Sequence, residues 1–148
     1  MAGAARSAMD RVEKRHGAVD SFIAERLGYD KAAVGKYFAA EQIDAIAAAI
    51  DNIERGAAFI IGDQTGLGKG RQVAAMLRYA MRNNMVPVLV TEKPDLFGDM
   101  YRDLRDIGVT EMLGREPRMF ITNTGETIPL DEEALNWKQE ANAARPCW

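Results

Sequence analysis

Apolar side chains recur every three to four positions in four stretches of the chain, a period that predicts α-helices. The stretches are residues 9–27 with a break at Gly17, 39–55, 69–83 and 95–108. Two other segments, 57–61 and 85–91, are continuously apolar, as in strands that are buried on both faces of a sheet. A weaker third strand is predicted at 118–122, whereas residues 1–8 are small and weakly patterned and predict a frayed arm.

The order of these segments alternates helices with strands from residue 39 onward. In such an order the strands pair in parallel and the helices cover both faces of the sheet, with right-handed crossovers. The sequence therefore predicts an α/β fold with a parallel sheet, preceded by a helical extension over residues 1–38.

Composition narrows the class of protein only slightly. The 148 residues suffice for about one domain, and a formal net charge of -3 gives no global attraction to nucleic acid or anionic lipid. Cys147 is the single cysteine, which fits a reducing compartment. The apolar runs are far shorter than the roughly 18 to 20 residues of a membrane span. Together these features predict a cytoplasmic protein with no membrane partner.

The strongest chemical signal is the segment GDQTGLGKGR at residues 62–71, between a predicted strand and a predicted helix. Glycines allow consecutive backbone N–H groups to point into one anion-binding concavity, and the start of a helix adds further N–H groups and its dipole. An ammonium at position 69 can reach the β- and γ-phosphates of a nucleotide. The predicted phosphate contacts are Thr65, Gly66, Gly68, Lys69, Gly70 and Arg71.

Several of these positions also allow a structural explanation. The whole segment could be a glycine turn with Lys69 in solvent, Thr65 could pack within the loop, and Arg71 could lie on a solvated helix face. The segment also departs from the phosphate-loop pattern G-x-x-x-x-G-K-[ST], because Asp63 occupies the first position and Gly70 the hydroxyl position. A hydroxyl there normally binds Mg²⁺, so the magnesium ligands must be water or residues outside the segment, and the metal site is unknown.

Residues 63–70, DQTGLGKG, resemble the DExGxGKT form of motif I in Swi/Snf-type superfamily 2 helicases. The longer string EQIDAIAAAIDNIERGAAFIIGDQTGLGKGRQVAAMLRYA, residues 41–80, resembles the strawberry notch-like helicases more closely, since those proteins carry GKGR. The resemblance covers about residues 37–108. It implies that residues 39–148 form part of a RecA-like lobe that binds ATP and Mg²⁺, with Lys69 as the catalytic lysine.

The same resemblance matches Gln42 to the glutamine that reads the adenine edge, for which a side-chain amide has the required donor and acceptor. An exposed position on the helix surface is the alternative. Lys93 matches the motif that touches the tracked strand, or else it is a solvated loop lysine. The implied partners are DNA and the remaining helicase lobes, with a fused methyltransferase as a further candidate, in a bacterial or phage-infected host.

The acidic motif II of such motors is not evident. Asp131 and Glu132 follow too short an apolar run for a buried strand, and Pro129 removes a ladder donor, so an acidic helix start is the better interpretation. We therefore expect negligible ATPase activity from this chain alone. A small P-loop phosphotransferase and a non-enzymatic P-loop interaction module remain alternatives.

Three other polar residues are predicted to face solvent. His16, the single histidine, is expected at a solvated helix end because it has no partner for a metal site. Arg78 and Arg82, one helical turn apart, are expected on a solvated helix face.

Overall fold

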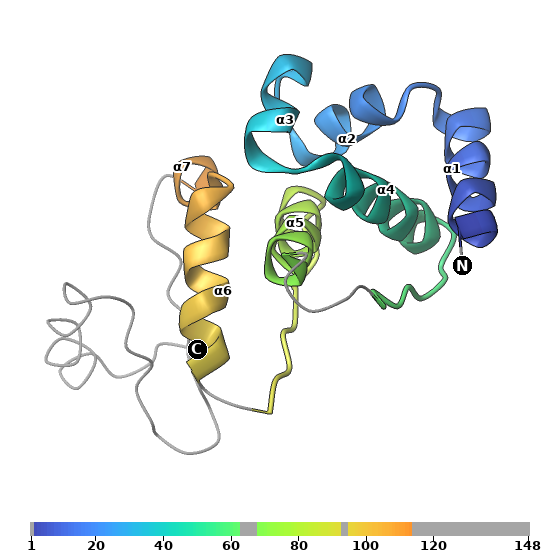
Figure 1. Cartoon of the computed structure of the whole chain (residues 1–148). Helices are drawn as coiled ribbons and strands as arrows, with labels where there is room; N and C mark the ends of the chain where they lie inside the picture. The colour runs from blue at the N-terminus through green and yellow to red at the C-terminus, as the bar shows by residue number, and fades with distance from the viewer. Residues whose placement is uncertain (1, 63–67, 93–94, 114–148) are drawn as a thin grey trace, which may run out of the picture. The chain divides into compact units, whose positions relative to one another are not determined.

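The computed structural model describes residues 2–62, 68–92 and 95–113, which fall into two compact units, Met1–Val88 and Leu89–Trp148 (Figure 1). The predictions for Thr65, Gly66, Lys93, the strand at 118–122 and Asp131 with Glu132 concern residues outside the described ranges. The elements of the described ranges are α1 (Ala2–His16), α2 (Val19–Leu27), the 3-10 helix η1 (Lys31–Ala33), α3 (Val34–Tyr37), α4 (Ala40–Glu54), α5 (Lys69–Arg82), α6 (Asp95–Asp106) and α7 (Val109–Leu113).

Helix α4 is the centre of the first unit and packs against α1, α2 and α5 (Figure 1). Its buried stripe has the helical period that the sequence predicts, with Ile43, Ile46, Ala47 and Ile50 all removed from solvent. Fully burying one isoleucine contributes about 1.5 to 3 kcal/mol to folding. The core of this unit therefore lies between helices.

The end of α2 is held by side chains from α5. Gly28 has φ of 69° and ends the helix, and Tyr29 N–H donates to Ala24 O over 2.8 Å, as in a Schellman motif. Arg78 Nε donates to Leu27 O over 2.7 Å, and its guanidinium lies 4.2 Å from the centre of the Tyr29 ring. Arg78 is only 5% exposed, so the expectation of a solvated face is wrong for this arginine.

A buried carboxylate joins α1 to α4. Asp51 is 4% exposed, and its oxygens lie 2.6 Å from Arg15 Nη2, 3.0 Å from His16 Nε2 and 3.4 Å from Arg55 Nε. The His16 ring also stacks on Phe22 at a centroid distance of 4.0 Å. His16 is therefore not a solvated helix-end residue as expected, because α1 folds back onto α2 and α4.

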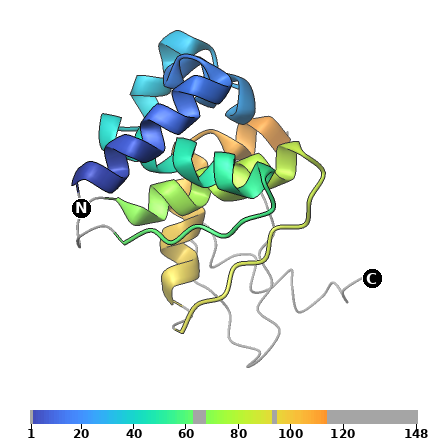
Figure 2. The same ribbon diagram turned by 90° about the vertical axis from the view of Figure 1, so that its right-hand side faces the viewer.

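The predicted α/β fold with a parallel RecA-like sheet is wrong for the described part of the chain. Residues 57–61 and 85–91 form no strand there, and both run as irregular segments (Figure 2). Several of their apolar side chains are exposed, with 89% of Ile60, 88% of Val86, 79% of Val88 and 85% of Val90 accessible.

The physical reason is that a strand exists only with a neighbour that accepts and donates its ladder hydrogen bonds. A continuous apolar run predicts burial but does not identify the segment with which it would pair. In the first unit α2, α4 and α5 bury one another, so the core forms without the two apolar segments.

The second unit contains an amphipathic helix pair. Helix α6 buries Met100, Tyr101 and Leu104, and α7 packs against it after a turn at Gly108, where φ is 71°. A positive φ favours glycine. The helix predicted for 95–108 is confirmed.

The first helix begins closer to the start of the chain than the sequence pattern predicts. Helix α1 begins at Ala2, so the frayed arm expected for residues 1–8 is wrong for the residues described there. In the described ranges, no helix combines the length and the apolar character needed to cross a membrane. The domain boundary expected between residues 38 and 39 stays a prediction.

The side chain of Asp44 on α4 is expected to make the stability of the fold depend on pH. Partial burial raises the pKa of Asp44, and the carboxylates of Asp20, Glu41 and Glu13 raise it further. The folded chain therefore holds the Asp44 proton more tightly than the unfolded chain, so the ionised carboxylate lowers stability at neutral pH. This loss disappears as the pH falls below the ordinary aspartate value of about 4.

We expect Asp44→Asn to raise the midpoint of thermal unfolding slightly at pH 7 and to leave it unchanged at pH 3. Thermal denaturation followed by circular dichroism at both pH values measures this difference. Asp10→Asn on the exposed side of α1 is the control. Stabilisation of equal size at both pH values would contradict the electrostatic explanation.

Candidate functional site

The site predicted from the glycine-rich segment lies at the beginning of α5. Gly68 precedes the helix in the left-handed region, with φ of 68° and ψ of 42°. Its carbonyl accepts hydrogen bonds from Arg71 N–H at 3.1 Å and Gln72 N–H at 3.4 Å, which closes the first turn. The first N–H groups of any helix have no acceptor within the helix and form a ready anion site.

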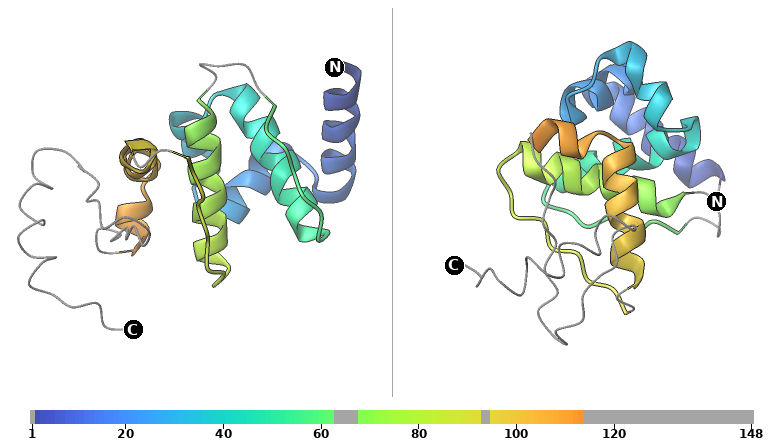
Figure 3. Two further views of the ribbon diagram at one scale, coloured as in Figure 1. Left: turned by 90° about the horizontal axis from the view of Figure 1, so that it is seen from below. Right: turned by 90° about the vertical axis from the view of Figure 1, so that its left-hand side faces the viewer.

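Gln42, 26 residues earlier, comes to the same place. It lies in the first turn of α4, where its Oε1 accepts a hydrogen bond from Ala39 N–H over 3.0 Å. Its Nε2 donates to Gly68 O over 3.5 Å. The first turns of α4 and α5 lie at the same end of the unit (Figure 3, left). The structure thus brings Gln42 to the glycine segment, whereas contact with adenine stays a prediction.

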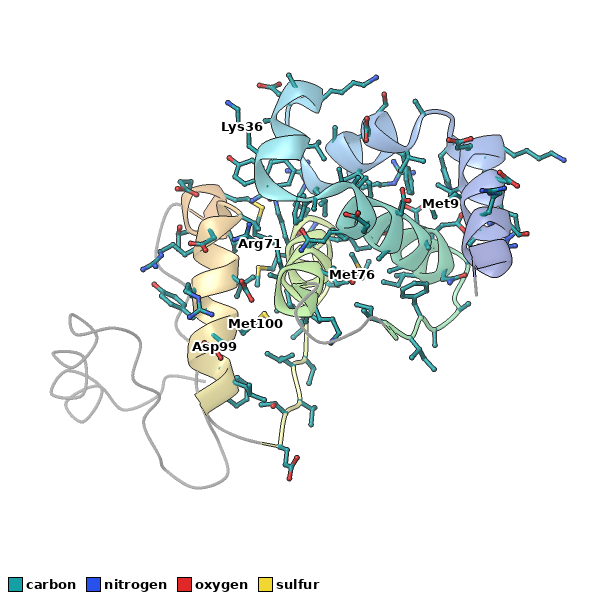
Figure 4. All side chains as sticks on the ribbon, viewed as in Figure 1. Met9, Lys36, Arg71, Met76, Asp99 and Met100 are labelled. Carbon is teal, nitrogen blue, oxygen red and sulfur yellow. The ribbon has the colours of Figure 1, made fainter. Side chains whose placement is uncertain are left out.

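Arg71 fixes a third segment at this end of α5. Its side chain is half-buried, and Nη1 donates to Tyr37 O over 3.3 Å, at the end of α3 (Figure 4). The Tyr37 ring stacks on Tyr29 at a centroid distance of 4.6 Å. Arg71 is therefore not simply part of a solvated helix face, and its contact with phosphate stays a prediction.

Lys69 and Gly70 form the first turn of α5, and both are half-buried. An ammonium beside helix N–H groups is a donor set that suits phosphate oxygens. Gly70 has no side chain to block the approach of phosphate to those N–H groups. Contact of Lys69 and Gly70 with the phosphates of a nucleotide stays a prediction.

The magnesium ligands are not identified by the described residues. Gly70 has no hydroxyl to offer the ion. Among residues 2–62, 68–92 and 95–113, no three His, Cys, Asp or Glu side chains lie together in a way that could hold a metal ion. Magnesium binding therefore stays a prediction drawn from the type of motif.

Sequence reasoning missed Tyr37 as a member of this cluster. Its carbonyl takes part, and a backbone acceptor has no residue-type signature. The sequence does contain a weaker indication that the chain just before α4 is fixed in place. Phe38 and Ile43 are both buried and occupy the N′ and N4 positions around the first turn of α4. Apolar residues at these positions form a hydrophobic staple that fixes how the chain enters a helix.

Comparison with known proteins gives one family. Residues 19–126 match the family described as P-loop containing NTP hydrolase pore-1, and this match covers well over half of the 148 residues. Searches of curated proteins and of solved structures returned no match. The matched range includes Gln42, the glycine-rich segment and the whole of α5. The chain therefore belongs to the family of P-loop containing NTP hydrolase pore-1 proteins.

Proposed function

We propose that residues 62–71 bind the phosphates of ATP and that the chain is the nucleotide-binding part of a superfamily 2 helicase or translocase of the strawberry notch-like type. One observation carries the nucleotide-binding proposal: the segment GDQTGLGKGR opens the long helix α5, with Lys69 as its first residue. Membership in a family of P-loop NTP hydrolases supports the same chemistry at a coarser level.

Each residue of the site has a distinct part in this proposal. The Lys69 ammonium neutralises phosphate charge, and the N–H groups at Gly68 and Gly70 donate to phosphate oxygens. Thr65 and Gly66 add contacts from the preceding loop, and Arg71 holds the first turn of α5 against Tyr37 O. When bound, Mg²⁺ would offset the charge of the phosphates.

The motor part of the proposal rests on the resemblance of residues 37–108 to strawberry notch-like helicases. In the intact protein, the remaining lobes would supply the acidic motif and the arginine fingers that phosphoryl transfer requires. Hydrolysis would then drive movement along DNA, in a phage or mobile-element protein that acts in the bacterial cytoplasm. This chain alone would bind nucleotide without appreciable turnover.

Isothermal titration calorimetry with ATP, ADP and tripolyphosphate tests the nucleotide site. We expect the wild type to bind ATP with micromolar affinity, which corresponds to about 8 kcal/mol. A hydrogen bond to a charged group contributes about 1.5 to 3 kcal/mol, so Lys69→Ala should weaken binding of all three ligands about 10- to 100-fold.

Lys14→Ala, on the exposed surface of α1, is the matched control and should leave the affinities unchanged. Circular dichroism checks that each variant is folded. No heat of binding with folded wild type would overturn the proposal and favour an interaction module. Steady-state release of phosphate that Lys69→Ala abolishes would instead favour a self-sufficient phosphotransferase.

A further inference from the structure

Gln42 uses both ends of its side-chain amide in contacts within the chain. The Oε1 atom accepts from Ala39 N–H at 3.0 Å, which satisfies a donor at the start of α4. The Nε2 atom donates to Gly68 O at 3.5 Å. One side chain therefore connects the first turn of α4 to the residue from which α5 begins.

Gly68 is packed closely against this amide. A β-carbon added at Gly68 would collide with Gln42 Nε2, so the two residues leave no room for a side chain between them. The positive φ of 68° also disfavours any residue other than glycine at this position. Gln42 thus restrains the junction at which the glycine-rich segment becomes a helix.

The direction of the helix N–H groups and the place of Lys69 both depend on that junction. The Gly68 carbonyl that receives Nε2 also accepts the N–H groups of Arg71 and Gln72, which define the first turn. A binding site held in place before the ligand arrives avoids the entropy loss of ordering it afterwards. A contact to this carbonyl therefore affects phosphate affinity without touching phosphate.

We propose that Gln42 is a positioning residue, which holds Gly68 so that the first turn of α5 and Lys69 face the phosphates, and that it does not select the base. This inference rests on the proposed nucleotide site at residues 62–71. It changes the role that the resemblance implies for Gln42, from reading adenine to supporting the phosphate site.

The two roles give different ligand profiles in calorimetry with ATP, GTP and tripolyphosphate. A positioning role predicts that Gln42→Ala weakens all three by the same factor, about fivefold for one lost neutral hydrogen bond. A base-reading role predicts a larger loss for ATP than for GTP and unchanged binding of tripolyphosphate, which has no base. That second profile would overturn the proposal.

Gln42→Glu separates positioning from general stability through its pH profile. The glutamate keeps an acceptor for Ala39 N–H, but at pH 7.5 a carboxylate replaces the amide donor and repels Gly68 O. Near pH 4, the protonated carboxyl group can donate again. We expect the affinity of Gln42→Glu for tripolyphosphate, relative to the wild type at the same pH, to be reduced at pH 7.5 and to recover near pH 4. A ratio that does not change with pH would contradict the proposal.

Gly56→Ala is the matched control for a purely structural effect. Gly56 lies just beyond the other end of α4, has φ of 71° and has no atom within 4 Å of an added β-carbon. Its replacement strains the backbone next to the same helix without touching Gly68. If Gly56→Ala reduced tripolyphosphate binding as much as Gln42→Ala, the effect of Gln42 would be on the stability of α4 alone. If wild type failed to bind tripolyphosphate, the proposed nucleotide site itself would be wrong.

Discussion

Replacing Asp51 by alanine is expected to lower the free energy of unfolding by about 2 to 3 kcal/mol, the largest stability effect at any single position considered. The carboxylate is almost fully buried and faces Arg15, His16 and Arg55. Removing one partner of a fully buried ion pair costs about 3 to 5 kcal/mol, because a charge is left without compensation. The arginine side chains here are 35% and 44% exposed and can turn toward water, which reduces the expected loss.

Urea denaturation followed by circular dichroism measures this change. Glu25→Gln is the control, since Glu25 pairs with Arg26 at 2.9 Å but its side chain is 75% exposed. Such surface pairs contribute about 0.2 to 1 kcal/mol. Hydrogen exchange shows where in the structure the effect occurs. In Asp51→Ala, the amides of α1 should lose protection against exchange while those of α5 are still protected. Equal losses of stability in the two variants would contradict the role assigned to Asp51.

Gly68→Ala is expected to weaken ATP binding at least about tenfold, because the alanine cannot keep both the backbone angle and the contact with Gln42. The left-handed conformation alone costs a non-glycine residue about 1 to 2 kcal/mol. The added methyl group also displaces the Gln42 amide from Gly68 O, so the first turn of α5 shifts. Small displacements of positioned groups have large effects on the interactions that they make.

Calorimetry with ATP measures the change, and Gly56→Ala supplies the same backbone strain at a place with no neighbouring atom. The control should lose stability and keep its affinity for ATP. In the double variant Gln42→Ala with Gly68→Ala, the collision disappears while the strain remains. The loss of ATP affinity in the double variant should therefore be smaller than the sum of the losses in the two single variants, as for residues in contact. Simple additivity would show that the two side chains act independently.

Helices could be predicted from this sequence because their signal is local. The period of Ile43, Ile46 and Ile50 is contained in α4 itself, and the predicted range of 39–55 differs from Ala40–Glu54 by one residue at each end. The start of α5 was predicted from the glycines before it and is confirmed at Lys69.

The predicted sheet is wrong for the described residues because the pairing of strands has no local signal in the sequence. The apolar residues at 57–61 and 85–91 have the composition of buried strands, yet a strand is defined by the backbone that pairs with it. Nothing in Ile60 or Val88 specifies such a neighbour. In the described ranges the two segments remain outside the helical core, with these side chains exposed.

The candidate site also contains some residues that have a local sequence signal and some contacts that have none. The glycine-rich segment predicts Gly68 and Lys69 as phosphate contacts because its chemistry is local; the structure places them at the start of α5, and their contact with phosphate stays a prediction. Gln42 was assigned by resemblance, and the structure places it against Gly68. Arg71 donates to the Tyr37 carbonyl, 34 positions away in the sequence. In the same unit, His16 pairs with the buried Asp51 carboxylate, 35 positions away. Such pairs leave no pattern in a single sequence.

The docking of α1 on α4 also determines how far this domain can be shortened. The family match begins at residue 19, but Arg15 and His16, which hold the Asp51 carboxylate, precede it. A protein trimmed to the matched residues would keep the buried Asp51 carboxylate and lose two of the side chains that contact it. We therefore expect a protein that includes the whole of α1 to be more stable than one trimmed to the matched residues.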